Sequence, residues 1–166
     1  MSNTQNNFKL LFSMPVIVAA LGYFVDIYDL ILFGIVRVSS LKELGLSPSQ
    51  ITDTGAQILN MQMAGMLLGG ILWGILGDKK GRMSVLLGSI ILYSTANLLN
   101  GFVQDVGSYM ALRFIAGIGL AGELGAGVTL VAELLPKAIR GYGTMIIASV
   151  GVTGAIAANF IAQSFD

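Results

Sequence analysis

The chain has 166 residues, of which 55% are hydrophobic and 11% are charged, and nine basic side chains balance nine acidic ones. This composition is far more apolar than that of a soluble domain, so it predicts an integral membrane protein. The sequence contains no cysteine and no histidine, and its zero net charge gives no polybasic surface for nucleic acid. We therefore expect no metal site, no cofactor and no nucleic-acid partner.

Five apolar stretches are long enough to cross a bilayer, which takes roughly 20 residues of helix. In chain order they are 14–36, 55–77, 83–103, 109–135 and 142–165. We expect residues 1–13 to form a polar N-terminal tail and residues 14–166 to form five transmembrane helices. The connections are short except for the first, in which "LSPSQ" supplies a turn and a helix cap at Ser47 or Ser49.

Lysine and arginine residues in the short connections predict the orientation of the chain. One side of the membrane would carry Lys9, Lys79, Lys80, Arg82, Lys137 and Arg140. The other side would carry only Arg37 and Lys42. We therefore expect the N-terminus in the cytoplasm.

Charged side chains also lie inside the predicted spans, Asp26 and Asp29 in the first and Arg113 and Glu123 in the fourth. Each ionised group would cost about 2.5 to 3.5 kcal/mol if it faced lipid, and the four together roughly 10 to 14 kcal/mol. This sum is comparable with the stability of a whole domain, so the groups must face protein or water. Asp26 and Asp29 share a helix face with Phe33, and Arg113 is the expected partner of the two carboxylates.

These charges have two interpretations, a buried structural ion-pair cluster or a group that binds substrate and protons. One arginine cannot neutralise three carboxylates, and like charges close together favour protonation of one of them. Because the sequence has no histidine, Asp and Glu are the natural candidates for a proton relay.

The predicted second and fifth spans are rich in small residues, whereas the charges fall in the first and fourth. Gly65 and Gly69, and then Gly70 and Gly74, lie four residues apart in the second span, and Gly151 lies in the fifth. Small residues at this spacing let helix backbones approach closely, so we expect helix packing at Gly65, Gly69, Gly70 and Gly151. Charged spans and spans rich in small residues therefore each recur after three helices, as in transporters built from inverted three-helix repeats.

The stretch "GILGDKKGR", from Gly74 to Arg82, resembles the signature between the second and third helices of the major facilitator superfamily. Asp78, Gly81 and Arg82 stand at the signature's spacing, and Met83 departs from its final basic residue. The specificity of this spacing after a membrane span favours the resemblance over a plain cytoplasmic turn.

Further motifs resemble one branch of this superfamily, the metabolite:proton symporter family. "RFIAGIGLAGELGAG", which begins at Arg113, is similar to the fourth-helix motif, with Glu123 ten residues after the arginine. "AELLPKAIRG" supplies Glu133 and Arg140 in the E-x-x-P-x-x-x-R-G arrangement that this family shares with sugar porters. The first helix is also similar, although Asp26 stands where Glu is common, and Ala116 stands where many symporters of this family have Gln.

The resemblance implies an all-α fold of five helices from an N-terminal six-helix half, in a chain that lacks the sixth helix and the C-terminal half of the transporter. It implies alternating access, with Asp26, Asp29, Arg113 and Glu123 lining the cavity, Arg113 attracting an anionic group and carboxylates exchanging the coupled proton. A cytoplasmic latch would be formed by Gly74, Asp78, Gly81, Arg82, Glu133 and Arg140. We therefore expect a proton-coupled symporter of a small organic acid or zwitterion in the bacterial inner membrane.

The sequence is also compatible with other functions. A sugar porter or a uniporter of the same superfamily is the main alternative. An intramembrane aspartyl protease would pair Tyr28-Asp29 with G-x-G-D, but Ile75 to Asp78 lacks the leading glycine. A membrane scaffold without transport would leave the buried charges as structure. We expect a transporter and not an enzyme.

Overall fold

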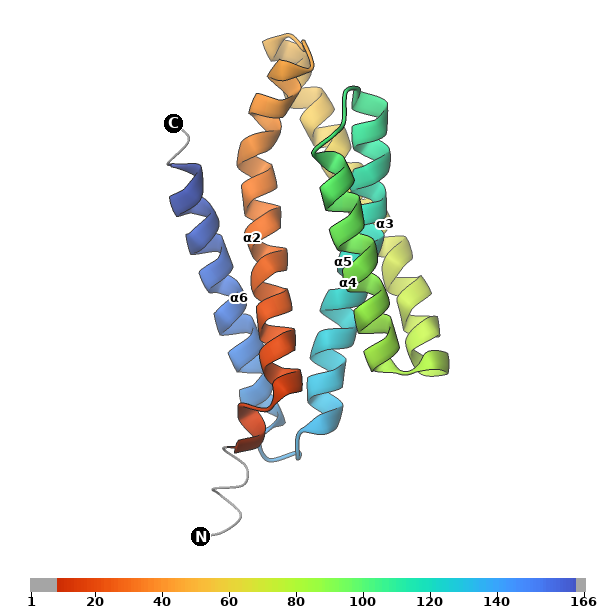
Figure 1. Ribbon diagram of the computed structural model, residues 1–166, viewed down its shortest axis with the longest axis vertical. Helices are drawn as coiled ribbons and strands as arrows, with labels where there is room; N and C mark the ends of the chain where they lie inside the picture. The colour runs from red at the N-terminus through yellow and green to blue at the C-terminus, as the bar shows by residue number, and fades with distance from the viewer. Residues whose placement is uncertain (1–8, 164–166) are drawn as a thin grey trace. The chain divides into compact units, whose positions relative to one another are not determined.

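The computed structural model describes residues 9–163, which contain five long α-helices and no β-strand (Figure 1). The helices are α2 (Met14–Glu43), α3 (Pro48–Lys80), α4 (Arg82–Asn100), α5 (Val106–Leu134) and α6 (Arg140–Ala162). All five are long and apolar enough to cross a membrane, which confirms the predicted all-helical membrane protein. Residues 1–8 of the predicted tail and the end of the last predicted span, 164–165, lie outside the described residues.

The helices α2 and α3 extend beyond the predicted spans, because the apolar stretch marks the bilayer core whereas the helix continues until the backbone meets a stop signal. For α2 that signal is Gly45, whose φ of 82° is readily adopted only by glycine. For α3 it is Ser47, the N-cap, whose backbone N–H donates to Gln50 Oε1 at 3.1 Å. The predicted cap at Ser47 is confirmed.

The connections that follow are set by a glycine and a proline. Gly81 ends α3 with φ 86°, donates its N–H to Gly77 O at 3.0 Å, and α4 begins at the next residue. Pro136 follows the end of α5, and its carbonyl accepts the N–H of Arg140 at 3.0 Å, where α6 begins. Glycine readily adopts the positive φ that ends α3, and proline lacks the N–H that would continue α5, so each residue favours a break in the helix.

The chain divides into two compact units, each of which is described by itself. The terminal unit comprises Met1–Leu32 and Ala126–Asp166, and the central unit comprises Phe33–Gly125. The core of the terminal unit is formed by apolar side chains of its three helical segments, namely Leu11, Val16, Ala19, Ala20, Val131, Leu135, Ile139 and Ile147. The core of the central unit is formed by Phe33, Leu41, Ile51, Ile58 and Tyr109.

Within the terminal unit, glycines of α6 bring it close to α2. A Cβ added at Gly151 would collide with the ring of Tyr23, and one added at Gly154 would collide with the carbonyl oxygen of Phe24. Packing at Gly151 was expected from the sequence. Gly154, three residues further along the same helix, adds the contact with backbone.

Within the central unit, α3 and α5 touch through their backbones. A Cβ at Gly65 would collide with the carbonyl oxygen of Phe114, and one at Gly117 with the carbonyl oxygen of Gln62. A Cβ at Gly69 would lie 2.6 Å from the carbonyl oxygen of Ile118. These glycines therefore allow an approach that any side chain would prevent.

Gly70 does not take part in this contact, contrary to the expectation. No atom of the described residues beyond its own helix and chain neighbours lies within 4 Å of its Cβ position, and the same holds for Gly74. The reason is helical geometry, because one residue turns the helix by about 100°, so Gly70 points away from the face that Gly69 presents. The G-x-x-x-G spacing of Gly70 and Gly74 therefore marks no helix contact in the described chain.

Large apolar side chains cover the outward face of α3. Leu67, Ile71 and Ile75 are 71%, 59% and 54% exposed. Such a face would be unfavourable in water but is compatible with the hydrocarbon core of a bilayer, where apolar surface needs no protein cover. This exposure fits the membrane environment that the helix lengths indicate.

Candidate functional site

The charged residues of the predicted spans are mostly withdrawn from the surface. Asp26 is fully buried on α2 and Asp29, three residues later, is half-buried. On α5, Arg113 is 7% exposed and Glu123 is 8% exposed. The aspartates belong to the terminal unit, and Arg113 and Glu123 belong to the central unit, so the pairing of Arg113 with the aspartates stays a prediction.

Arg113 lies against two aromatic rings of the central unit. The central carbon of its guanidinium group lies 3.7 Å from the centroid of the Phe33 ring and 5.8 Å from that of Tyr109. The two rings meet edge to face, with centroids 6.0 Å apart and planes at 84°. A cation over an aromatic face in a desolvated place gains about 2 kcal/mol, so the rings help to hold a charge inside an apolar helix bundle.

This arrangement determines what the arginine can do chemically. The guanidinium group lies over the Phe33 ring, and its N–H donors project from the edge of its own plane. That edge matches the two oxygens of a carboxylate, which is the basis of bidentate Arg–carboxylate recognition. The site is therefore suited to an anionic group of planar geometry.

Tyr109 was not predicted from the sequence as a neighbour of Arg113. The two residues lie four apart on α5, and side chains at this spacing share a helix face, so the signal was present in the sequence. Trp73 was not predicted either, and its indole N–H donates to the carbonyl oxygen of Ile118 at 2.7 Å. An indole inside a predicted span whose N–H needs an acceptor was the signal for that bond.

The connection between α3 and α4 brings part of the predicted latch together. Arg82 Nη2 lies 2.8 Å from Asp78 Oδ1, and Gly81 turns the backbone between them with φ 86°. A Cβ at Gly77 would lie 2.6 Å from Arg82 Nη1, so the glycine leaves room for the arginine. The side chains are 27% exposed for Arg82 and 72% for Asp78, so the ion pair is worth little by itself.

The remaining latch residues are not placed beside this ion pair. Gly74 is exposed on α3, with no atom of the described residues outside its own helix within 4 Å of its Cβ position. Glu133 and Arg140 are exposed and belong to the terminal unit, whereas Asp78 and Arg82 belong to the central unit. A role of Glu133 and Arg140 in the latch stays a prediction.

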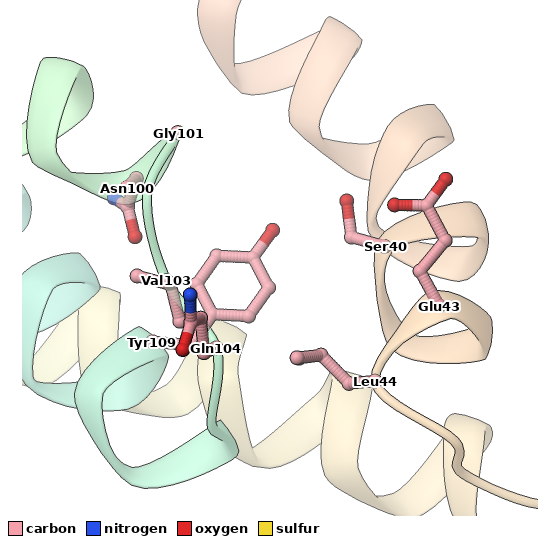
Figure 2. A pocket seen from close by; sticks show the side chains of 8 residues that line it. All are labelled: Ser40, Glu43, Leu44, Asn100, Gly101, Val103, Gln104 and Tyr109. Carbon is pink, nitrogen blue, oxygen red and sulfur yellow. The ribbon is translucent and has the colours of Figure 1, made fainter.

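The central unit also contains a cavity of about 500 Å³ (Figure 2). Its lining is rich in polar groups. These include Ser40 and Glu43 from the end of α2, Asn100 at the end of α4, Gln104 in the connection that follows, and Tyr109 from α5. In Figure 2, the Tyr109 hydroxyl projects toward the side of the cavity formed by Ser40 and Glu43. The same tyrosine ring lies near Arg113, so the cavity begins one helical turn from the arginine.

Comparison with known proteins gives the family of the chain. A family model described as Major Facilitator Superfamily matches residues 19–165. The chain is 36% identical over 140 residues to a metabolite transport protein of Haemophilus influenzae. It is 31% identical over 132 residues to a niacin transporter of Acinetobacter baylyi, and 32% identical over 134 residues to a gentisate transporter of Corynebacterium glutamicum.

These three similarities cover 82%, 80% and 80% of this chain, but only 33%, 29% and 29% of the relatives. The chain therefore spans about a third of the length of the curated relatives it matches. The match of the family model over most of the chain, together with five apolar helices of membrane-spanning length, leads to one conclusion. This chain is an integral membrane protein that belongs to the major facilitator superfamily.

Proposed function

We propose that the chain forms the N-terminal part of a secondary transporter that carries a small organic acid across the membrane together with a proton. The observation that carries this proposal is Arg113, 7% exposed inside a membrane span and stacked on Phe33. A permanently charged group is costly at this depth, and such groups in membrane spans generally serve a substrate or ion pathway. The relatives named for niacin and gentisate support an acid, since both compounds carry a carboxyl group on an aromatic ring.

In this proposal, Arg113 binds the carboxylate of the substrate, and Asp26, Asp29 and Glu123 exchange the coupled proton. The burial of Asp26 and Glu123 supports this division, because ionisable groups withdrawn into membrane spans generally serve a substrate or proton pathway. Substrate that neutralises Arg113 would then alter the balance of charge at the carboxylates. Proton binding and substrate binding are coupled in this way without any cofactor or metal ion.

Transport by alternating access requires a second half that the proposal places outside this chain, with the central site between the two halves. The Asp78–Arg82 ion pair at the turn between α3 and α4 is proposed to be part of a latch on the cytoplasmic side, together with Glu133 and Arg140. The excess of Lys and Arg on that side supports a cytoplasmic N-terminus. The bacterial relatives support a bacterial inner membrane.

The proposal is tested with the complete transporter reconstituted in liposomes. Nicotinate and 2,5-dihydroxybenzoate are offered with and without an inward proton gradient, and glucose is offered as a neutral solute. We expect the gradient to drive accumulation of an acid. Equal flux with and without the gradient would indicate a uniporter, and uptake of glucose alone would indicate a sugar porter.

Variants then locate the site. Arg113→Ala should lower kcat/KM for uptake roughly 10- to 100-fold, since it removes charge-assisted hydrogen bonds. Asp29→Asn should abolish accumulation of the acid against its own concentration gradient. Asp53→Asn is the matched control, because Asp53 is an exposed carboxylate near the start of α3. Wild-type accumulation in both Arg113→Ala and Asp29→Asn would refute the site.

A further inference from the structure

The cavity beside Tyr109 lies where three candidate spans end. Glu43 is the last residue of α2, Asn100 is the last residue of α4, and Tyr109 lies in the first turn of α5. The ends of membrane spans lie at the boundary between hydrocarbon and water, at the level of the lipid headgroups. A ligand can therefore reach this cavity either from the aqueous side or from the headgroup layer.

The charge of the lining favours a cation. Glu43 is the one ionised side chain among the described residues that line the cavity, and no Lys or Arg lines it. Lys42, its neighbour along α2, does not contribute to the lining. The Glu43 carboxylate would repel an anion in the cavity, whereas a cation there would gain a counter-ion.

The uncharged groups of the lining favour a cation that carries N–H donors. The hydroxyl oxygens of Ser40 and Tyr109 and the amide oxygen of Gln104 can each accept a hydrogen bond, as can the Glu43 carboxylate. A primary ammonium group has three N–H donors for such acceptors. A quaternary ammonium has none and is usually bound by a cage of aromatic faces, but Tyr109 is the one aromatic residue of this lining.

A metal ion fits this lining less well. Calcium takes six to eight oxygen ligands, usually with several carboxylates among them, and magnesium keeps most of its water. The described residues contain no group of three or more acidic side chains that could hold a metal ion. The single carboxylate of the cavity is enough for one monovalent cation.

The position of Tyr109 in the cavity wall is fixed by packing in the core of the central unit. Tyr109 is 6% exposed, packs edge to face on Phe33 and belongs to the core of the central unit with Leu41 and Ile58. Its hydroxyl therefore stays in a fixed position relative to the wall formed by α2. Such preorganisation lowers the entropy that a bound group must lose.

We propose that this cavity binds a primary ammonium group, from a phosphatidylethanolamine headgroup or from a soluble amine, with Glu43 as the counter-ion. The cavity lies one helical turn of α5 from Arg113, and binding there does not require transport. Its volume of about 500 Å³ exceeds what an ammonium group alone needs, so it can also accept the atoms that follow the ammonium in either ligand.

The test measures binding to the complete transporter in detergent micelles by native mass spectrometry. The probes are phosphatidylethanolamine, phosphatidylcholine with the same acyl chains, and ethanolamine. Each is titrated against the wild type, Glu43→Gln and the control Asp53→Asn, which removes an exposed carboxylate of α3 that does not line the cavity. Unfolding midpoints show whether the variants fold, and the exposure of Glu43 makes a loss of folding unexpected.

We expect Glu43→Gln to weaken binding of an N–H-bearing probe about tenfold, with Asp53→Asn unchanged. Preferential loss of phosphatidylethanolamine identifies the lipid as the source, and loss of ethanolamine identifies a soluble amine. The proposal is overturned if the wild type and Glu43→Gln bind both phosphatidylethanolamine and ethanolamine equally, or if Glu43→Gln weakens binding of phosphatidylcholine as much as binding of the N–H-bearing probes. Since no flux is measured, this result and that of the uptake assay are independent of each other.

Discussion

Substitution of two neighbouring glycines of α3 should have opposite effects on stability. In Gly69→Ala, the new methyl group would lie 2.6 Å from the carbonyl oxygen of Ile118 and 2.7 Å from its Cα. Favourable contacts of carbon lie at about 3.5 to 4.0 Å, so α3 and α5 would have to separate by roughly 1 Å. Because both obstructing atoms are backbone, no side-chain rotation relieves the clash, and we expect a loss of about 1 to 3 kcal/mol.

Gly70→Ala is the matched control, since no atom of the described residues outside its own helix and chain neighbours lies within 4 Å of its Cβ position. Alanine there should gain up to about 1 kcal/mol from its higher helix propensity. The two variants should therefore differ by roughly 1 to 4 kcal/mol in the free energy of unfolding.

The difference is measured on the complete protein in detergent, by titration with a denaturing detergent or by thermal unfolding followed by circular dichroism. Gly69→Ala should unfold before the wild type, and Gly70→Ala should unfold with it or after it. Equal midpoints for the two variants would refute the backbone contact between α3 and α5.

Three further predictions concern single residues of the connections and of the helix contacts. Gly81→Ala should cost about 1 to 2 kcal/mol in unfolding free energy, because φ is 86° at this position; an unchanged unfolding midpoint would contradict it. Hydrogen bonds from the side chain and backbone of Ser108 lower the pKa of Asp105. The contribution of this carboxylate to stability should therefore be present above the unfolded-state pKa of about 3.9 and be lost as the pH falls through the lowered folded-state pKa. Unfolding midpoints of Asp105→Asn and the wild type, measured against pH, should converge in acid. Trp73→Phe should lose about 0.5 to 1.5 kcal/mol, because the carbonyl oxygen of Ile118 loses its indole donor, and a midpoint equal to the wild type would count against that bond.

The number and type of the helices could be predicted from the sequence, because membrane-spanning segments carry long apolar stretches that need no tertiary information. The helix boundaries followed local chemistry, and the cap at Ser47 was predicted from its turn sequence. The predicted spans stopped short of Glu43, since hydropathy reports the bilayer core and not the end of the backbone hydrogen bonding.

The face by which each helix contacts its neighbours could not be predicted in the same way. Gly65 and Gly69 have the same spacing as Gly70 and Gly74, yet the first pair meets the backbone of α5 and the second meets no described residue outside its own helix. Only the position of the neighbouring helix distinguishes them. The stacking of Arg113 on Phe33 likewise joins residues 80 positions apart, which no local pattern reports.

The backbone contact between α3 and α5 also restricts the path of water through the protein. A water molecule needs a space of about 10 to 15 Å³ and polar partners, and none remains where the backbones touch at Gly65 and Gly117. A hydrated route for a polar solute therefore cannot pass between these two helices at this level. Water that reaches Arg113 must therefore arrive along another face of α5.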